Sequence, residues 1–217
     1  EIYTLSLHDA LPISIVDERI GRRFLGAGVG FGGGCLPKDI RAFTTRAREL
    51  GVQDAVAFLH EVDLINQRRR DRVVSLARRH LGGDLRGRRV TFLGAAFKPD
   101  SDDVRDSPAL DVARRLQEAG ALVTVCDPRA LPVVRCQHPG LRTEEDPAAA
   151  MSGAEAVLLL TEWDEFTGLD PHEAATWVSR PVMIDGRNAL DPEQWREAGW
   201  TMEMEERRVG KECRSRW

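Results

Sequence analysis

The second half of the chain alternates short apolar runs with helical segments, and this alternation constrains the fold more than any other feature. The amphipathic segment Pro108–Ala119 has the period of a helix and ends at Gly120. Strands that alternate with helices are typical of a parallel sheet covered by helices. We therefore predict a Rossmann-like α/β domain over residues 87–205. Its expected strands are Arg89–Leu93, Ala121–Val125, Ala154–Leu160 and Pro181–Ile184.

Residues 15–83 predict a helical region ahead of this α/β domain. Pro37 suits the first turn of a helix that ends before Gly51. A second helix is expected from about Asp54 to Leu81 and would be ~40 Å long. A helix of this length often packs across two domains or against a second subunit. Its expected apolar stripe comprises Val56, Leu59, Val62, Ile65, Val73, Leu76 and Ala77.

Composition excludes several classes of function. With 35 acidic and 31 basic side chains, the net charge is −4, which gives no electrostatic reason to expect nucleic-acid or membrane-surface binding. The arginine run at 68–72 is interpreted as a solvated helix face. No run approaches the ~18 apolar residues that a membrane span requires. Four cysteines without CxxC spacing, and histidines without HxH or HxxxH pairs, predict no metal site and reduced thiols in a cytoplasmic protein.

The two ends of the chain do not match its middle. Residues 1–14 lack a clean helical or strand period, and residues 207–217 are basic without a hydrophobic pattern. Both resemble translated adapter sequence, so we expect them to be non-native. The alternative is that they are native but disordered. Neither segment enters the fold prediction.

A glycine-rich segment at 24–39 is the most informative stretch for function. It contains Gly28-x-Gly30-x-x-Gly33, which formally matches a dinucleotide fingerprint. That fingerprint has meaning only between a strand and a helix, and the preceding residues 18–23 are too charged for a buried strand. We therefore reject an NAD site at this position. So many glycines still indicate unusual backbone conformations or close contact with a ligand.

Cys35 lies just ahead of the expected start of a helix. The partial positive charge of the helix and the cation of Lys38 would both favour a thiolate. Asp39 follows one helical turn later, where its carboxylate could reach a water molecule beside the sulfur. This grouping suits covalent catalysis. From these residues alone, a buried structural cysteine with two surface charges remains an equal alternative.

The same segment resembles the active-site signature of the UDP-glucose/GDP-mannose dehydrogenase family, whose members oxidise a sugar alcohol twice to a carboxylate. The matching residues are Glu18-Arg19-Ile20-Gly21, Phe24-Leu25 and Gly30-Phe31-Gly32-Gly33-Gly34-Cys35-Leu36-Pro37-Lys38-Asp39. Gly34 stands where the family commonly has serine, which removes a hydroxyl but no catalytic side chain. The similarity covers roughly residues 15–201.

This resemblance implies a role for each matching residue. Cys35 would form a thiohemiacetal and then a thioester with C6 of the sugar, and Asp39 would assist hydrolysis of the thioester. Lys38 would lie near NAD. Arg19 would reach the substrate of a neighbouring subunit, which implies a homodimer through the long helix. The residues expected to line the sugar-nucleotide pocket are Phe24, Leu25, Gly26, Ala27, Gly28 and Gly32.

The α/β domain resembles the UDP-binding domain of the same family. The loop after its first strand has one glycine, Gly94, where a dinucleotide site has three. By resemblance, Phe97, Lys98 and Arg187 would contact the sugar nucleotide, and Arg105 would contact NAD. Asp127 follows Gly94 by 33 residues, later than the ~20 of an NAD-binding acid, so we interpret it as structural.

The resemblance thus implies NAD-dependent oxidation of UDP-glucose to UDP-glucuronate, by a chain that lacks its NAD-binding domain and is inactive alone. Two alternatives remain. A GDP-mannose dehydrogenase shares the Cys-Leu-Pro-Lys-Asp core, although Gly-Phe-Gly-Gly and Glu18-Arg19-Ile20-Gly21 favour UDP-glucose. A non-catalytic nucleotide-sugar-binding or dimerisation module is the other, and the reactivity of Cys35 distinguishes it from an enzyme.

Overall fold

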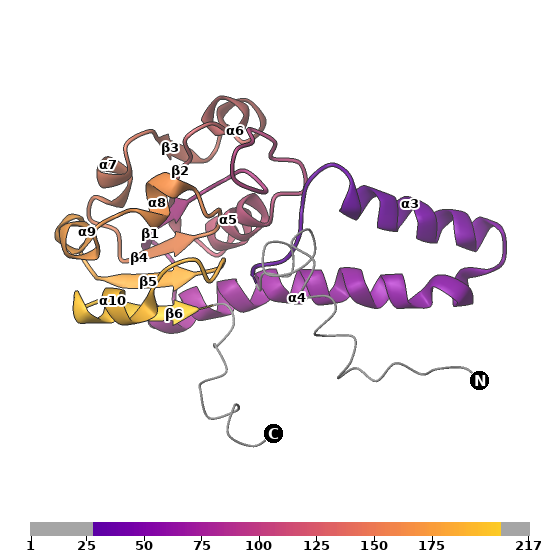
Figure 1. The fold of residues 1–217 in the computed structure, drawn as a ribbon, viewed down its shortest axis with the longest axis horizontal. Helices are drawn as coiled ribbons and strands as arrows, with labels where there is room; N and C mark the ends of the chain where they lie inside the picture. Colours follow the sequence, from indigo (N-terminus) through magenta and orange to yellow (C-terminus); the bar gives the residue numbers. More distant parts are fainter. Residues whose placement is uncertain (1–27, 205–217) are drawn as a thin grey trace, which may run out of the picture.

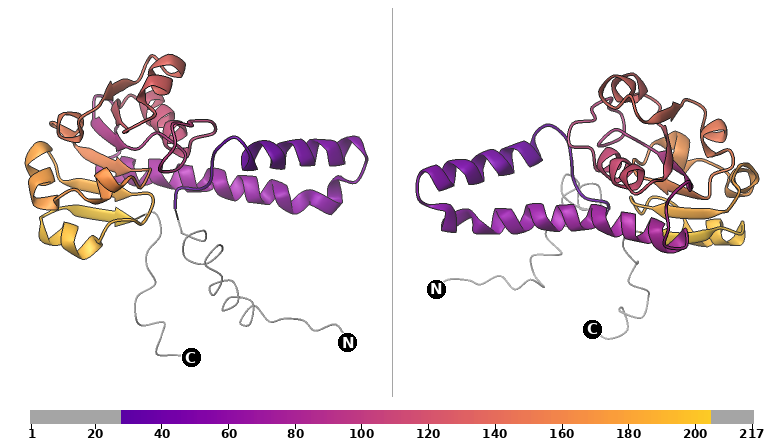
Figure 2. Two further views of the ribbon diagram at one scale, coloured as in Figure 1. Left: turned by 45° about the horizontal axis from the view of Figure 1, so that its top comes forward. Right: turned by 180° about the vertical axis from the view of Figure 1, so that it is seen from behind.

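The computed structural model describes residues 28–204. Two helices form a hairpin that projects from one side of an α/β domain (Figures 1 and 2). The first helix, α3, spans Leu36–Glu49, begins with Pro37 in its first turn and carries basic residues in its last turn. A 3-10 turn, η1 (Gln53–Val56), leads into α4 (Ala57–His80). Helix α4 has 24 residues, about 36 Å, and continues under the α/β domain (Figure 1).

The α/β domain contains a six-stranded parallel sheet in the order β3-β2-β1-β4-β5-β6. This order is that of a doubly wound Rossmann fold. The residues of β4 and β5 are all buried, as expected for strands that helices cover on both faces. The strands are β1 (Arg89–Leu93), β2 (Leu122–Cys126), β3 (Arg142–Glu144), β4 (Ala156–Leu159), β5 (Val182–Asp185) and β6 (Thr201–Met204).

Helices connect the parallel strands and cover both faces of the sheet. Helices α5 and α6 connect β1 to β2 and β2 to β3, and α4 packs beside α5 and against β5. On the opposite face, α7 packs on β1, β2 and β3 and contacts α9, which in turn contacts α10. The bounds are α5 (Pro108–Glu118), α6 (Leu131–Gln137), α7 (Pro147–Met151), α8 (Asp164–Thr167), α9 (Pro171–Trp177) and α10 (Pro192–Glu197).

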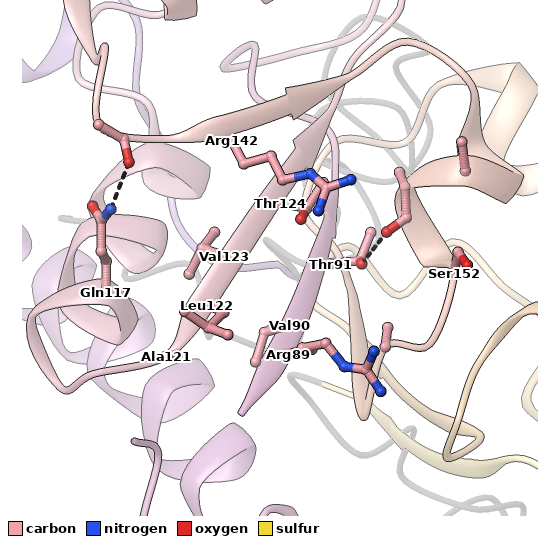
Figure 3. Close-up of a pocket in the computed structure, with 14 residues that line it drawn as sticks. Arg89, Val90, Thr91, Gln117, Ala121, Leu122, Val123, Thr124, Arg142 and Ser152 are labelled. Carbon is pink, nitrogen blue, oxygen red and sulfur yellow. Dashed lines mark hydrogen bonds between the residues drawn. The ribbon is translucent and has the colours of Figure 1, made fainter. Parts of the chain in front are cut away.

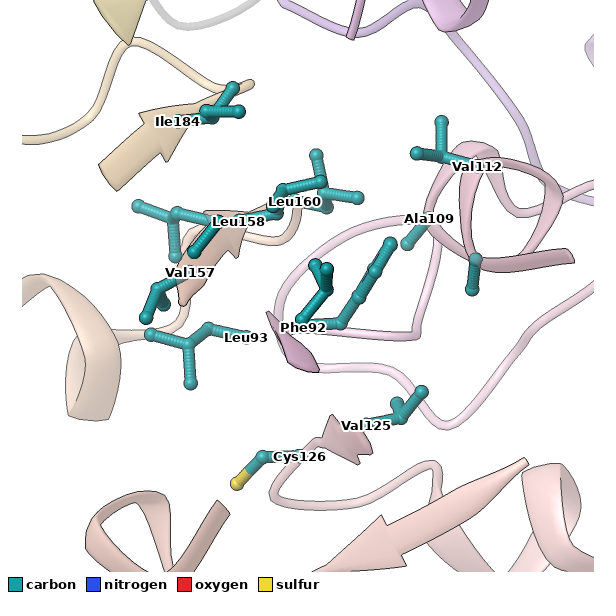
Figure 4. Close-up of a cluster of buried hydrophobic side chains, with 14 of the residues drawn as sticks. Phe92, Leu93, Ala109, Val112, Val125, Cys126, Val157, Leu158, Leu160 and Ile184 are labelled. Carbon is teal, nitrogen blue, oxygen red and sulfur yellow. The ribbon is translucent and has the colours of Figure 1, made fainter. Parts of the chain in front are cut away.

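The hydrophobic core lies between the sheet and these helices. Phe92 of β1 is fully buried and points toward Ala109 and Val112 of α5 (Figure 4). Leu158 and Ile184 continue the core across β4 and β5. Burying each such side chain stabilises the fold by about 1.5–3 kcal/mol, so the sheet is a stable support for the loops at its edges.

The predicted α/β domain and the long helix are confirmed, and the differences lie at the sheet edges. Strand β1 has the predicted bounds, and the other three expected strands are each found within two residues of them. The prediction of four strands was wrong because it omitted β3 and β6. Both are edge strands with charged residues, so neither has the continuous apolar run that marks a buried strand.

The predicted apolar stripe of α4 was wrong in the middle of the helix. Ile65 is 48% exposed, whereas the neighbouring Asn66 and Arg70 are each only 3% exposed. The interpretation of 68–72 as a solvated face therefore fails for Arg70. The reason is that this part of α4 faces polar backbone of the glycine-rich segment rather than the hydrophobic core.

Among residues 28–204, no helix is long and apolar enough to cross a membrane. The terminal segments 1–14 and 207–217, on which the sequence analysis made separate predictions, lie outside the described residues.

Candidate active site

Cys35 is the residue just ahead of α3, at the helix start that the sequence predicted, and its side chain is exposed. The backbone N–H of Asp39 donates to the Cys35 carbonyl oxygen at 2.8 Å, so the two residues are one helical turn apart. Lys38 extends its ammonium group toward Asp39, with 3.6 Å between Nζ and Oδ1. Both of these side chains are largely exposed, so the helix start presents a thiol, an ammonium and a carboxylate to solvent.

The glycine-rich segment before Cys35 packs against loops at the carboxyl edge of the sheet. Its Val29 N–H donates to the Gly186 carbonyl at 2.7 Å, just after β5. Its Gly33 N–H donates to the Arg105 carbonyl at 2.9 Å, in the loop between β1 and α5. Ligands of open α/β sheets bind beside the carboxyl ends of strands. The segment therefore brings Cys35 to the edge where a nucleotide is expected.

Two predicted substrate residues lie directly against this segment. The Phe97 ring is so close to Gly33 that a Cβ atom there would be 2.9 Å from Cε2. Arg187 lies beside Gly28, with Nη1 3.6 Å from such a Cβ position. The Arg187 guanidinium also forms a bidentate pair with Glu162, at 2.6 and 2.9 Å. Lys98 is exposed, and its ammonium lies 5.6 Å from the Phe97 ring centroid.

Arg105 is a cation that the fold brings against Gly34, the residue just before Cys35. A Cβ atom at Gly34 would be 2.4 Å from the Arg105 Cζ. The guanidinium forms a bidentate pair with Asp103, at 3.0 Å from Nε and 2.7 Å from Nη2. The hydrogen bonds that Arg105 donates to Asp103 raise the Arg105 pKa, and the charge of Cys35 contributes to the same shift. The guanidinium and the residue before the thiol thus come together from two separate loops.

Asp127 fills the turn that a dinucleotide would use. One carboxylate oxygen accepts the N–H groups of Ala95 (2.7 Å) and Ala96 (3.0 Å), and also the indole N–H of Trp163 (3.1 Å). The other oxygen accepts the N–H groups of Arg129 and Ala130. The amides after β1 therefore already hold an internal anion, which supports the structural interpretation of Asp127. This turn does not fit the pyrophosphate of NAD.

Asp185 organises the loop that carries Arg187. Its two oxygens accept the N–H groups of Arg187 and Leu190, each at 2.9 Å. Burial raises the pKa of Asp185, although these backbone hydrogen bonds act in the opposite direction. The loop conformation presents Gly186 to Val29 and Arg187 to Gly28.

The sequence analysis missed two residues of α4 that hold the glycine-rich segment, Asn66 and Arg70. Both hydrogen-bond to the backbone of Phe31. The available signal was their spacing: they lie four residues apart and continue, toward the N-terminus, the helix face that buries Val73 and Ala77. Polar residues on a buried helix face indicate specific partners.

A groove of about 490 Å³ lies at the opposite, amino-terminal edge of the sheet (Figure 3). Its lining includes Arg89, Leu122 and Arg142, and none of the predicted site residues. Within residues 28–204, no group of three or more His, Cys, Asp or Glu side chains could hold a metal ion. The predicted site residues Arg19, Phe24, Leu25, Gly26 and Ala27 lie outside the described part of the chain.

Comparison with known proteins identifies the family. Residues 2–68 match the model of the "UDP-glucose/GDP-mannose dehydrogenase family, central domain", and residues 91–192 match the "UDP binding domain" of the same family. The first match includes most of residues 1–14, which the sequence analysis set apart. A UDP-glucose 6-dehydrogenase of Rhizobium meliloti is 39% identical over 174 residues, which cover 80% of this chain and 39% of that protein. A UDP-glucose 6-dehydrogenase of Bacillus subtilis is 38% identical over 187 residues, which cover 85% of this chain and 40% of that protein.

Solved structures agree with these matches. A UDP-glucose dehydrogenase from Pyrobaculum islandicum has a TM-score of 0.73 at 39% identity, covering 89% of this chain and 42% of that one. A GDP-mannose dehydrogenase from Pseudomonas aeruginosa has the same fold, with a TM-score of 0.70 at 21% identity. The chain spans about two fifths of the length of the curated relatives it matches. With two domain models of one family matched in order along the sequence, the chain belongs to the UDP-glucose/GDP-mannose dehydrogenase family.

Proposed function

We propose that the chain is the central and UDP-binding part of an NAD-dependent UDP-glucose 6-dehydrogenase, which converts UDP-glucose to UDP-glucuronate in two oxidations. The observation that carries this proposal is the exposed Cys35 at the N-terminus of α3, packed through its glycine-rich segment against the carboxyl edge of the sheet. Relatives named UDP-glucose 6-dehydrogenase match 80–85% of the chain and support the same substrate.

The proposed role of Cys35 is to retain the sugar between the two oxidations. Its thiolate adds to the C6 aldehyde, a C–S bond forms, and the carbonyl oxygen takes up a proton to give a thiohemiacetal. Loss of the second hydride and of the hydroxyl proton leaves a thioester. Water then adds to C6, the C–S bond breaks, and the carboxylate leaves as the thiolate is restored. The aldehyde is never released.

Neighbouring charges suit these steps. The Arg105 guanidinium lies against the residue before Cys35, and helix α3 begins at the residue after it, so positive charge is available on both sides of Cys35. Asp39, one turn along the helix, accepts a proton from the hydrolytic water. In the complete enzyme NAD would supply the hydride acceptor, and Lys38 and Arg105 would face it from this chain. Because Asp127 occupies the amides after β1, NAD binds outside the sheet domain described here.

UDP-glucose is expected between the glycine-rich segment and the sheet loops. Phe97, Lys98 and Arg187 would contact it from the sheet domain. Arg187 then exchanges part of its pairing with Glu162 for the ligand, because a guanidinium recognises phosphate oxygens as it does a carboxylate. The residues expected from the other side are Phe24, Leu25, Gly26, Ala27, Gly28 and Gly32.

We also propose a homodimer through the helical hairpin, with Arg19 reaching the substrate of the neighbouring subunit. The supporting observation is apolar exposure: the Phe43 side chain on α3 is 59% exposed, and the Phe58 side chain on α4 is 63% exposed. Other exposed apolar residues of the hairpin are Leu36, Leu50, Val52, Leu64 and Ile65. The cytoplasm, where thiols stay reduced, is the compartment that suits Cys35.

The test is substrate protection of Cys35 against alkylation. UDP-glucose should slow modification of Cys35 in the 217-residue chain and leave that of the exposed Cys136 unchanged. If UDP-glucose changes the modification rate of neither thiol, the result contradicts the enzymatic proposal and favours a non-catalytic module. The isolated chain should produce no NADH from UDP-glucose, since the NAD-binding domain is not among the matched domains.

A GDP-mannose dehydrogenase remains the second candidate, because that enzyme from Pseudomonas aeruginosa has the same fold. Calorimetric titration separates the two. UDP-glucose should bind and GDP-mannose should not. Tighter binding of GDP-mannose would reassign the substrate.

A further inference from the structure

We infer that Asn66, supported by Arg70, is a positioning residue that sets the conformation of the glycine-rich segment and thereby places Cys35. The inference rests on the proposed function only for its catalytic meaning. The contacts themselves come from the long helix α4, none of whose residues has a role in the chemical steps proposed above.

The Asn66 side chain pairs with both backbone polar groups of one loop residue. Its Oδ1 accepts the Phe31 N–H at 2.8 Å, and its Nδ2 donates to the Phe31 carbonyl at 3.0 Å. This two-point contact copies the pairing that a neighbouring strand would make. Asn66 is 3% exposed, so bulk water does not compete for the groups in either hydrogen bond. The contact thus fixes both the position and the rotation of the Phe31 peptide groups.

Gly30 is fitted to the same side chain. Its φ of +102° is a conformation that residues other than glycine rarely adopt. A Cβ atom at this position would be 2.2 Å from the Asn66 Oδ1. The absence of a side chain at residue 30 is therefore what lets the Asn66 amide approach the backbone.

Arg70 extends the contact from the loop to the sheet domain. It lies one turn after Asn66 on α4 and is also 3% exposed. Its Nη2 donates to the carbonyl oxygens of Phe31 (3.1 Å) and Asp106 (3.4 Å), and its Nη1 donates to Asp111 (3.3 Å). The same guanidinium thus joins α4, the glycine-rich segment and the start of α5.

A short stretch of chain connects these contacts to the thiol. Phe31 precedes Cys35 by four residues, and Gly33 between them is held by the Arg105 carbonyl. Glycine loses more conformational freedom on folding than any other residue, so a loop this rich in glycine needs external partners to keep one conformation. Asn66 and Arg70 are partners on one side, and the sheet loops are partners on the other.

The experiment compares Asn66→Leu and Asn66→Asp with the matched control Gln67→Leu, all in the 217-residue chain. Gln67 is the next residue on α4, and its side chain contacts Arg115 rather than the loop. Hydrogen exchange at the Phe31 amide reports the contact directly. The pH profile of Cys35 alkylation reports the position of the thiol, which a purely structural role would leave unchanged.

We expect Asn66→Leu to speed Phe31 exchange at least about tenfold, since the N–H loses its acceptor, and to shift the pH profile of Cys35. Asn66→Asp keeps an acceptor for the Phe31 N–H, so the Phe31 amide should stay protected from exchange. It loses the donor to the Phe31 carbonyl, so the pH profile of Cys35 alkylation should still shift. Gln67→Leu should change neither. If Asn66→Leu does not fold, the Asn66→Asp profile decides, and an unshifted profile overturns the inference.

Unchanged Phe31 exchange and an unshifted profile in a folded Asn66→Leu variant would also overturn the inference. Failure of the proposed function would give a different result: UDP-glucose would not protect Cys35 of the wild-type chain against alkylation. The exchange result at Phe31 is independent of that outcome.

Discussion

The guanidinium group of Arg105 lies against the backbone of Gly34, where a Cβ atom would be 2.4 Å from Cζ. This relationship joins the loop after β1 to the residue just before Cys35. It also connects Gly34, where the sequence resemblance implies a serine, to the placement of a cation against the residue before the thiol.

Replacement of Gly34 by serine should therefore displace the Arg105 guanidinium. Because the obstructing atoms are the end of a flexible side chain, stability should change by less than about 0.5 kcal/mol. Cys35 alkylation at neutral pH should slow about two- to fivefold, the range of one exposed charge interaction. Gly34→Ala tests the steric part without the hydroxyl, and Arg105→Gln removes the charge directly. A Cys35 rate that is equal in all three variants and the wild type would refute the role of Arg105.

The two cysteines Cys35 and Cys126 should differ sharply in reactivity. Burial, followed by the charges of Asp127, Asp146 and Glu144, raises the pKa of Cys126 to about 12. At pH 8 such a thiol is ionised to about one part in 10⁴. Iodoacetamide at pH 8 should modify the exposed Cys35 and leave Cys126 intact until urea unfolds the chain. Peptide mass mapping measures both, and early modification of Cys126 in the folded chain would contradict its burial.

Asp127→Ala should destabilise the sheet domain by about 3 kcal/mol or more, because five N–H groups lose their acceptor. The emptied turn after β1 is a set of amides suited to an anion. Sulfate should therefore raise the Tm of the variant more than that of the wild type. Sodium chloride at equal ionic strength is the control. An equal sulfate effect on both proteins would show that the emptied turn does not hold an anion.

Asp111 should make the contact between α4 and α5 sensitive to acid. Burial raises its pKa, but hydrogen bonds from Arg115, Arg114 and Arg70 outweigh burial and lower the pKa overall. A lowered folded pKa contributes stability above the unfolded pKa of about 3.9 and loses it as pH falls through the folded value. Asp111→Asn should cost about 1–3 kcal/mol at pH 7, measured by urea unfolding.

The cost of Asp111→Asn should shrink as the pH falls below about 4, because the carboxylate of the unfolded chain takes up its proton there while the lowered pKa keeps the folded carboxylate ionised to lower pH. The control is Glu118→Gln, which removes a largely exposed partner of Arg114 and should cost less than about 0.5 kcal/mol at any pH. A cost of Asp111→Asn that stays constant down to pH 3 would contradict the assignment.

Sequence reasoning located the buried strands because apolar residues dominate them, as in the continuous apolar run Ala156–Leu159. It missed β3 and β6 because edge strands such as Arg142–Glu144 bury too little surface to leave that pattern. It placed Cys35 at a helix start from Pro37 and the periodicity that follows, which are local signals.

Local signals could not reveal contacts between distant segments. Arg105 and Gly34 are 71 residues apart, and Asn66 and Phe31 are 35 apart. Arg70 lies within a run, 68–72, that in isolation indicates a solvated, arginine-rich helix face, and Asn66 lies just before that run.

The order of residues alone therefore defined the buried strands, the longer helices, the α/β class and the cysteine at a helix N-terminus, because hydrophobic periodicity and helix caps act between near neighbours. Only the folded chain decided which cation lies beside the cysteine, which carboxylate fills the turn after β1 and which amide holds the glycine-rich segment. Those pairings depend on the packing of α4 and the loops against the sheet, and packing joins residues without regard to their separation in the chain.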